Sequence, residues 1–389
     1  MKIALFTNYP RKEGAVSGGV AAVAVCLVKA LSKINDIEVH VITFDRTLHD
    51  VLVEKDNEVT VHRIPGTGWP QILDIHCGPG RKRLVHYVMK LAPDILHTHE
   101  TYGLTIGEFP IPHVHTIHGF DPDTILVNGG RFAWFRSVLW GVVERRALAK
   151  HRFLISITPY ARHKVEPLTQ ARIFDIDNPI DPRFYQIQRQ EEKGRILSVG
   201  MISEGKNTLA TIKAFAKVRA RGLKAALVVA GGNHPKYYKR IVEFVDQAGL
   251  RECIQFLGHI GHDQLVSELA RVSILVLPSR QENAPMAIAE AMAAGVPVIS
   301  SNRCGMPFMV REGETGYLVE PDDVDALVER IMLLLTDDAL RNAMGSAGRR
   351  EAEMRFHPDK IAQKTVEAYR NVIELTLNRL DEGTCHDLI

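Results

Sequence analysis

The feature that most constrains this chain is a repeated alternation of short apolar runs with longer helical segments. Short runs rich in branched residues are typical of buried parallel strands, and the segments between them are long enough for crossover helices. Two such series follow one another, which predicts two doubly wound parallel sheets, an α/β fold, facing an interdomain cleft. The predicted strands are Lys2–Asn8, Glu38–Phe44, Asp94–His99, His113–His118 and Arg152–Ile157 in the first series, and Arg195–Gly200, Ala225–Gly231, Cys253–Gly258, Ser273–Pro278 and Pro297–Ser301 in the second.

The domain boundaries follow from where this alternation is interrupted. Residues 177–194 are polar, contain two prolines and show no clear period, so we expect an interdomain linker there. The prediction is a Rossmann-like N-terminal domain over residues 1–180 and a Rossmann-like C-terminal domain over 195–356. Residues 357–389 are expected to form a helix that returns to the N-terminal domain. The length of 389 residues suits two domains.

The composition limits which cellular compartment and which classes of binding partner suit this chain. The net charge is +2 with 24% charged residues, so the chain lacks the basic excess of a nucleic-acid-binding protein. The five cysteines are scattered and no two have metal-site spacing, which favours a reduced, cytoplasmic setting. The chain starts with a predicted strand, not a signal peptide. No apolar run approaches the roughly 18 residues of a membrane span, so we expect a soluble or peripheral protein.

The segment from Ser279 to Ser301 carries two carboxylates, Glu282 and Glu290, around a predicted helix start. Pro285 suits the first helical position, which leaves Glu282 in the strand-to-helix loop and Glu290 inside the helix. The free N–H groups of Met286 and Ala287 would attract an anion. A ligand with both phosphate and hydroxyl groups fits this set. The alternative is that Glu282 is a solvated loop residue and Glu290 has no special partner.

Two further segments have residues suited to anion binding. Gly18 and Gly19 follow the first strand and open a helix, where small residues let a phosphate or sugar approach the backbone. The pattern is not that of a dinucleotide site, and a plain tight turn is the alternative. Lys206 follows the first strand of the second series at the next helix start, where a lysine and the helix dipole together favour an anion. Here the alternative is a solvated surface lysine.

Histidines crowd the ends of two predicted strands, at positions 97, 99, 113, 115 and 118. Zinc is one interpretation, because imidazoles and the nearby Glu100 are reasonable ligands, but no set has a known metal spacing. Histidines satisfied in the core are a second interpretation. A third is that His118 lies at the carboxyl end of its strand, where a neutral imidazole can donate to a sugar hydroxyl.

A helix predicted from Arg131 to Lys150 mixes aromatic residues and arginines. We expect its apolar face to pack against the sheet. The alternative is a helix on a membrane surface, and the basic cluster from Gly80 to Tyr87 would add to such contact.

Taken together, these motifs resemble the retaining glycosyltransferases of the GT-B fold, family 4 (glycosyl transferases group 1). The resemblance covers nearly the whole chain and is strongest in the glutamate pair with seven intervening residues. It rests on "SGGV", "PDILHTHE", "HTIHG", "NPID", "VGMISEGKN", "FLGHI", "AMAAGVPVIS" and "REGETGYLVEPDD".

The resemblance implies a role for each matching position. Glu290 would hold the nucleotide ribose, Glu282 the donor sugar, and Lys206 the diphosphate. The donor-binding set would also include Met286, Ala287, Asn283, Pro285, Gly18 and Gly19, and His118 would contact the donor sugar. No metal or other cofactor is expected, because Lys206 and backbone dipoles would neutralise the leaving group. Peripheral contact with the inner face of the membrane is a further expectation.

The implied activity is transfer of a hexose from a nucleotide sugar, preferably a UDP-sugar, to a glycan or lipid-linked acceptor in polysaccharide or envelope biosynthesis. A sugar-nucleotide 2-epimerase of the same fold and a non-catalytic nucleotide-sugar-binding protein are the alternatives. The sequence departs from the family at Met201, where arginine is frequent. It departs again at Cys304 and Phe308, which stand where a glycine and a glutamate are usual.

Overall fold

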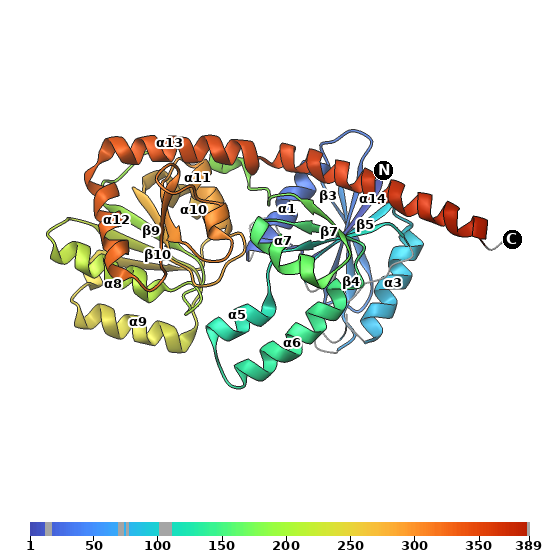
Figure 1. The fold of residues 1–389 in the computed structure, drawn as a ribbon, viewed down its shortest axis with the longest axis horizontal. Coiled ribbons are helices and arrows are strands. Elements are labelled where there is room, and N and C mark those ends of the chain that lie inside the picture. Colours follow the sequence, from blue (N-terminus) through green and yellow to red (C-terminus); the bar gives the residue numbers. More distant parts are fainter. Residues whose placement is uncertain (12–17, 69–73, 75–77, 101–110, 387–389) are drawn as a thin grey trace. The chain divides into compact units, whose positions relative to one another are not determined.

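A computed structural model describes residues 1–11, 18–68, 74, 78–100 and 111–386, with side chains described as far as Arg379. The chain divides into two compact units (Figure 1). Unit 1 contains Met1–Gly119, Leu139–Pro179 and Pro358–Ile389, and unit 2 contains Phe120–Val138 and Ile180–His357. Each unit is built on one sheet, so each is described by itself.

The sheet of unit 1 has the strand order β3-β4-β2-β1-β5-β6-β7-β8. All neighbours in it are parallel except β3 and β4, which form an antiparallel hairpin at one edge. The strands are β1 Lys2–Phe6, β2 Glu38–Asp45, β3 Leu52–Asp56, β4 Val59–Pro65, β5 Ile95–His99, β6 His113–Ile117, β7 Phe153–Ser156 and β8 Arg172–Asp175. The main helices associated with this sheet are α1 Gly19–Leu31, α3 Pro79–Leu91, α7 Pro159–Val165 and α14 Pro358–His386.

Helix α14, the last element of the chain, contributes to the core of unit 1. Its apolar residues recur every three or four positions and are buried beside α1 and the sheet, as expected for an amphipathic helix: Ile361, Ala362, Val366, Tyr369 and Val372. The fully buried Tyr369 hydroxyl hydrogen-bonds with His97 Nδ1 of β5 at 2.6 Å. Among the described helices, none is both long and apolar enough to cross a membrane.

The sheet of unit 2 is entirely parallel, with the strand order β11-β10-β9-β12-β13-β14. Its strands are β9 Arg195–Val199, β10 Ala226–Ala230, β11 Ile254–Gly258, β12 Ile274–Leu277, β13 Val298–Ser301 and β14 Gly316–Val319. The helices of this unit are α8 Thr208–Ala220, α9 Pro235–Gln247, α10 His262–Arg271, α11 Met286–Ala293, α12 Val324–Thr336 and α13 Asp338–Arg355.

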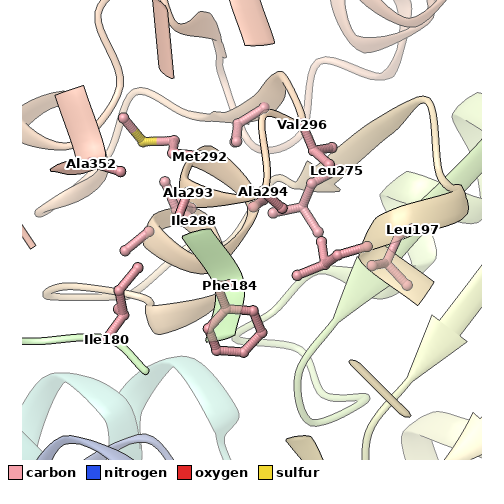
Figure 2. Packing of buried hydrophobic residues seen from close by; sticks show 14 of the residues in the cluster. Ile180, Phe184, Leu197, Leu275, Ile288, Met292, Ala293, Ala294, Val296 and Ala352 are labelled. Carbon is pink, nitrogen blue, oxygen red and sulfur yellow. The ribbon is translucent and has the colours of Figure 1, made fainter. Parts of the chain in front are cut away.

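Alternate residues of the central strands of unit 2 belong to two cores, one on each face of the sheet. Leu197 of β9 and Leu275 of β12 join the cluster around Ile288 and Met292 of α11 (Figure 2). Ile196 and Ile274, their neighbours in the chain, join a second cluster with α8 and α12, such as Phe215 and Leu327. This division follows from the strand geometry, in which successive side chains point to opposite faces. Burial on both faces explains why these strands are continuously apolar.

The prediction of two doubly wound α/β domains is confirmed, and each predicted strand is present. Strands β3, β4, β8 and β14 were not predicted from the sequence. Pro285 is the residue before the first turn of α11 and not its first helical residue. The segment expected as a linker packs on unit 2 from Ile180 onwards, and Ile180 and Phe184 are fully buried in the first core (Figure 2).

The helix predicted from Arg131 to Lys150 is present as α6 Ala133–Leu148, whereas α5 Asp121–Asn128 before it was not predicted. The expectation for how α6 packs is wrong. The apolar side chains of its first half, including Trp134, Phe135, Val138 and Leu139, are exposed and do not pack against a sheet. The buried positions of α6 include Ser137, Glu144, Ala147 and Leu148.

Candidate active site

The candidate donor site of unit 2 lies where the strand order of the sheet changes direction. From β9 the chain moves outward through β10 and β11, then returns to place β12 on the other side of β9. The loops after β9 and β12 therefore leave the same edge of the sheet as neighbours. In open α/β sheets ligands bind at this point, outside the carboxyl ends of the strands.

Contacts between the two loops fix their positions. The backbone N–H of Arg280, after β12, donates to the Gly205 carbonyl, after β9, at 2.8 Å. The Arg280 guanidinium donates to the Glu204 carbonyl at 2.7 Å. Lys206 Nζ forms an ion pair with Glu282 Oε1. Two of the residues predicted for catalysis are thus in direct contact, one from each loop.

The side chain of Lys206 lies over the backbone of Gly200, the residue that follows β9. Gly200 has φ +139°, and a Cβ there would lie 3.1 Å from Lys206 Cε. A larger residue at position 200 would therefore crowd the Lys206 side chain, whereas glycine leaves space for it. Burial lowers the pKa of the Lys206 ammonium to about 8. The adjacent Glu282 carboxylate opposes this effect, because an opposite charge favours the protonated form.

The loop that carries Glu282 packs closely against the backbone of Gly305, in the segment after β13. The Gly305 N–H donates to the Glu282 carbonyl at 3.0 Å. A Cβ on Gly305 would lie 1.5 Å from the Asn283 carbonyl oxygen, so no larger residue fits there without moving the loop. Asn283 is itself buried. Glycine at 305 therefore allows the segment after β13 to pass directly against the glutamate loop.

Helix α11 begins immediately after this loop. No side chain caps its N-terminus, and Pro285 occupies the capping position. The N–H groups of the first turn, including those of Met286 and Ala287, are the ones that an α-helix leaves without an intrahelical partner. Both residues are only half-buried. The predicted placement of an anion-attracting helix start between the two glutamates is therefore present in unit 2.

Glu290 lies in the second turn of α11 and is 5% exposed. Burial is the main cause that raises the pKa of this carboxyl to about 7; His262 opposes the shift and Asp181 adds to it. Its carboxylate makes no hydrogen bond or ion pair with another residue in the described parts of the chain. An accepting group in such a largely buried position is suited to the hydroxyl donors of a ligand.

The neighbours of Glu290 include Asp181 and His262, for which no role was predicted from the sequence. Asp181 accepts hydrogen bonds from the backbone N–H of Arg183 at 2.9 Å and from its guanidinium at 2.8 Å. His262 Nδ1 lies 3.6 Å from Asp181 Oδ2, and this interaction raises the pKa of the imidazole. The "NPID" motif contained Asp181, and the polar residues after β11 were the available signal for His262.

Three predicted site residues belong to unit 1. Gly18, with φ +89°, precedes α1, and Gly19 is the first residue of that helix; no side chain caps it. His118 follows β6, at the carboxyl end of the strand as predicted. Its Nε2 lies 3.0 Å from His99 Nδ1, and burial lowers the pKa of His118 to about 3. The imidazole is therefore neutral near pH 7.

The other histidines of the cluster at β5 and β6 (His97, His99, His113 and His115) are buried neutral groups in a hydrogen-bonded network. His97 Nε2 lies 2.7 Å from Thr116 Oγ1, and Thr98 Oγ1 lies 2.9 Å from His113 Nε2. Burial lowers the pKa values of His97 and His113 well below the usual range. In the described part of the chain, no three histidine, cysteine or acidic side chains form a group able to hold a metal ion.

Two of the positions that depart from the family pattern are Met201, in the loop after β9, and Cys304, which contacts the loop after β12. Met201 is 58% exposed directly after Gly200. The loop cations that could replace an arginine there are engaged, since Arg280 pairs with Asp322 at 2.6 Å and Arg303 with Glu320 at 2.7 Å. Cys304 has φ +53°, a conformation that favours the usual glycine, and its thiol donates to Gln281 Oε1 at 2.9 Å.

Comparisons with known proteins agree with this geometry. Residues 17–184 match the model described as Glycosyltransferase Family 4, and residues 181–351 match Glycosyl transferases group 1. The chain is a glycosyltransferase. It is 25% identical over 368 residues to an uncharacterized glycosyltransferase of Methanocaldococcus jannaschii, covering 91% of this chain and 95% of that one. It is 27% identical over 302 residues to the N-acetyl-alpha-D-glucosaminyl L-malate synthase of Bacillus anthracis, covering 72% and 75%.

Solved structures show the same architecture. The sucrose-phosphate synthase of Thermosynechococcus elongatus superposes with a TM-score of 0.78 at 23% identity, covering 96% of this glycosyltransferase and 99% of that chain. Anabaena HepE superposes with a TM-score of 0.68 at 17% identity, covering 94% and 98%. The fold is therefore GT-B.

The burial of Glu290 leads to a prediction about stability and pH. The folded-state pKa of about 7 exceeds the ordinary value of 4.5, so the folded protein binds an extra proton between these values. Stability is therefore lost as pH rises from about 4.5 to 7. We expect Glu290→Gln to raise the free energy of unfolding at pH 8 by up to about 3 kcal/mol. The gain should vanish near pH 4.5.

Urea denaturation of both proteins at pH 4.5, 6 and 8 measures this difference. Glu252→Gln, which changes an exposed glutamate in the short turn Arg251–Cys253, is the matched control and should show no pH-dependent gain. A constant difference between Glu290→Gln and the unchanged protein across this range would contradict the proposed ionisation.

Proposed function

We propose that this glycosyltransferase is a retaining enzyme that moves a hexose from a nucleotide sugar to a glycan or lipid-linked acceptor. A UDP-sugar is the preferred donor, and the product would serve polysaccharide or envelope biosynthesis in the cytoplasm. The observation that carries the proposal is the Lys206–Glu282 ion pair beside the start of α11, with the buried Glu290 one turn further on. Retention of configuration and the class of acceptor rest on family resemblance.

The chemistry of a nucleotide sugar accounts for each part of this arrangement. A diphosphate would compete with Glu282 for the Lys206 ammonium and would add the N–H groups at the start of α11 as donors. Glu282, released from the ion pair, would accept hydrogen bonds from the hydroxyls of the transferred sugar. Glu290 would accept those of the ribose, which explains a buried carboxylate without a described hydrogen-bond partner. The roles of His118, Gly18 and Gly19 stay predictions.

Charge stabilisation without a metal is consistent with these residues. As the bond from the sugar to the diphosphate lengthens, negative charge grows on the leaving group and positive charge on the sugar. Lys206 and the helix start would stabilise the former, and Glu282 the latter. Two charges of opposite sign held in advance at adjacent positions suit a reaction that separates charge.

Known proteins of this architecture support a nucleoside diphosphate but differ in the base. The HepE structure is described as a complex with UDP and glucose. A GDP-mannose-dependent mannosyltransferase of Mycobacterium tuberculosis is 32% identical over 174 residues, covering 43% of this chain and 44% of that protein. We retain UDP as the first choice and include GDP donors in the test.

A screen of UDP-, GDP- and ADP-sugars by thermal unfolding tests the proposed donor. A ligand present at 100 times its dissociation constant stabilises the folded state by about 2.7 kcal/mol, so the true donor should raise the midpoint clearly. Prolonged incubation with that donor alone, followed by product analysis, should show slow release of nucleoside diphosphate and free sugar.

The same incubation separates the alternatives. Conversion of the donor sugar to its C2 epimer would indicate an epimerase. Tight binding without turnover, with any acceptor tried, would indicate a binding protein. The absence of stabilisation by every nucleotide sugar would contradict the proposed function itself.

Different roles for the two glutamates give a kinetic prediction. Ribose is remote from the bond that breaks, so Glu290→Ala should weaken UDP binding and raise KM. Glu282 would touch the sugar near the reacting carbon, so Glu282→Ala should bind UDP almost normally but lower kcat by about 100-fold or more. Calorimetric UDP affinities and steady-state rates measure both effects. Glu252→Ala, at an exposed site, is the control.

The opposite pattern would reverse the assigned roles. If Glu282→Ala lost UDP affinity and Glu290→Ala kept it, the ribose would lie at Glu282. If neither variant changed either quantity, the site would lie elsewhere.

A further inference from the structure

Helix α6 presents an apolar face to solvent. Its residues Trp134, Phe135, Val138, Leu139 and Val142 are all exposed, with Trp134 at 72% and Phe135 at 61%. Their spacing of three to four residues places them along one side of the helix. Phe132, just before the helix, is 66% exposed and adds a third aromatic ring. These six residues are called the α6 face below.

The opposite side of α6 is the one that the protein buries. Ser137, Glu144, Ala147 and Leu148 are buried, and two of these four are polar. From Trp134 to Val142 the helix therefore exposes apolar residues and buries the polar Ser137, which is the reverse of the arrangement that a surface helix of a soluble protein normally shows. Its apolar residues are placed for a partner outside the chain.

Apolar exposure is concentrated in this part of the molecule. Seven of the fifteen large apolar side chains that are exposed among the described residues lie between Leu126 and Val142. Isolated exposed apolar residues are normal, but a contiguous group with aromatic rings marks an interaction site.

The exposed charged residues of α6 and of the positions that flank it are all basic. Arg131 and Arg136 lie at its start, and Arg145, Arg146 and Lys150 lie at its end, all exposed. The only acidic residue between positions 131 and 150 is Glu144, which is buried. The Arg131 guanidinium lies 5.0 Å from the centre of the Phe132 ring. An apolar stripe flanked by cations at both ends complements a surface that is apolar and anionic.

We propose that the α6 face docks on the surface of an anionic lipid bilayer. The helix would lie in the plane of the interface, with Trp134, Phe135 and Leu139 entering the boundary between headgroups and acyl chains. Aromatic residues favour this depth, and arginines at the helix ends reach the lipid phosphates. A second copy of the chain would place the same cations against one another, so charge disfavours self-association.

This inference goes beyond the proposed function and does not depend on sugar transfer. It is tested by binding alone, without donor or acceptor. The sedimentation of the full chain is measured with vesicles of phosphatidylcholine containing 30% phosphatidylglycerol, and with phosphatidylcholine alone, at low and high salt. We expect co-sedimentation with the anionic vesicles that weakens with salt, and little with the neutral ones.

Two pairs of substitutions separate the apolar and the charged contributions. Trp134→Gln with Phe135→Gln should weaken vesicle binding by about tenfold or more. Arg145→Gln with Arg146→Gln should weaken it by roughly 30-fold at low salt, since each near-surface cation adds about a fivefold gain. All four residues are exposed, so the thermal midpoint should stay unchanged.

Matched controls change similar residues elsewhere. Met354→Gln with Leu377→Gln removes two exposed apolar residues from α13 and α14, and Lys236→Gln with Lys364→Gln removes two exposed cations from α9 and α14. Neither control should weaken vesicle binding as much as its α6 counterpart.

Three outcomes would overturn the proposal. The first is equal recovery of the unchanged protein in the supernatant with and without anionic vesicles. The second is an equal loss of binding in the α6 variants and their controls. The third is a concentration-dependent dimer, in sedimentation velocity, that Trp134→Gln with Phe135→Gln abolishes while vesicle binding persists, because the α6 face would then bind a second copy.

Discussion

The ion pair between Lys206 and Glu282 is the interaction on which the candidate donor site of unit 2 depends. The two residues are distant in the chain, and the strand order alone makes them neighbours, because β12 lies directly beside β9. Gly200 leaves room for the lysine, and Gly305 allows the segment after β13 to hold the glutamate loop. Parallel topology and two glycines thus produce a pair of opposite charges at one sheet edge.

The burial of Glu290 lowers the stability of the folded protein above the ordinary pKa of a glutamate. A carboxyl group in the second turn of α11 is surrounded by a core that would be more stable with an apolar or neutral residue there. Its pKa is raised to about 7 by this burial. Of its two charged neighbours, His262 favours the charged form of the carboxyl and Asp181 disfavours it. Under the proposed function, a bound nucleotide would supply hydrogen-bond donors to this carboxylate, which would couple binding to stability.

Much of the fold could be predicted because hydrophobic patterning is local. The parallel strands of unit 2 are continuous apolar runs, and "SILVLP" with the helix after it was readable as β12 and α11. The hairpin of β3 and β4 was missed because it lies at a sheet edge and its Leu52–Asp56 strand is exposed and mostly polar or charged. The exposed face of α6 was misjudged, since amphipathic composition does not say which face the protein covers.

For the candidate site, the positions of single residues could be predicted from the sequence, but the contacts between them could not. The sequence placed Lys206, Glu282 and Glu290 at strand ends and a helix start, but their mutual contacts depend on strand order, which no local pattern contains. His262 had no visible role until the fold brought it beside Asp181. Likewise, the availability of Arg280 and Arg303 could only be judged once their carboxylate partners, Asp322 and Glu320, were known.

A crystal structure with a bound nucleoside diphosphate would test the proposed donor site. We predict that the diphosphate lies at the start of α11 and within hydrogen-bonding distance of Lys206 Nζ, with the ion pair to Glu282 opened. Both ribose hydroxyls should lie on the Glu290 carboxylate. A nucleotide bound away from the β9 and β12 loops, with Lys206 still paired to Glu282, would contradict this prediction.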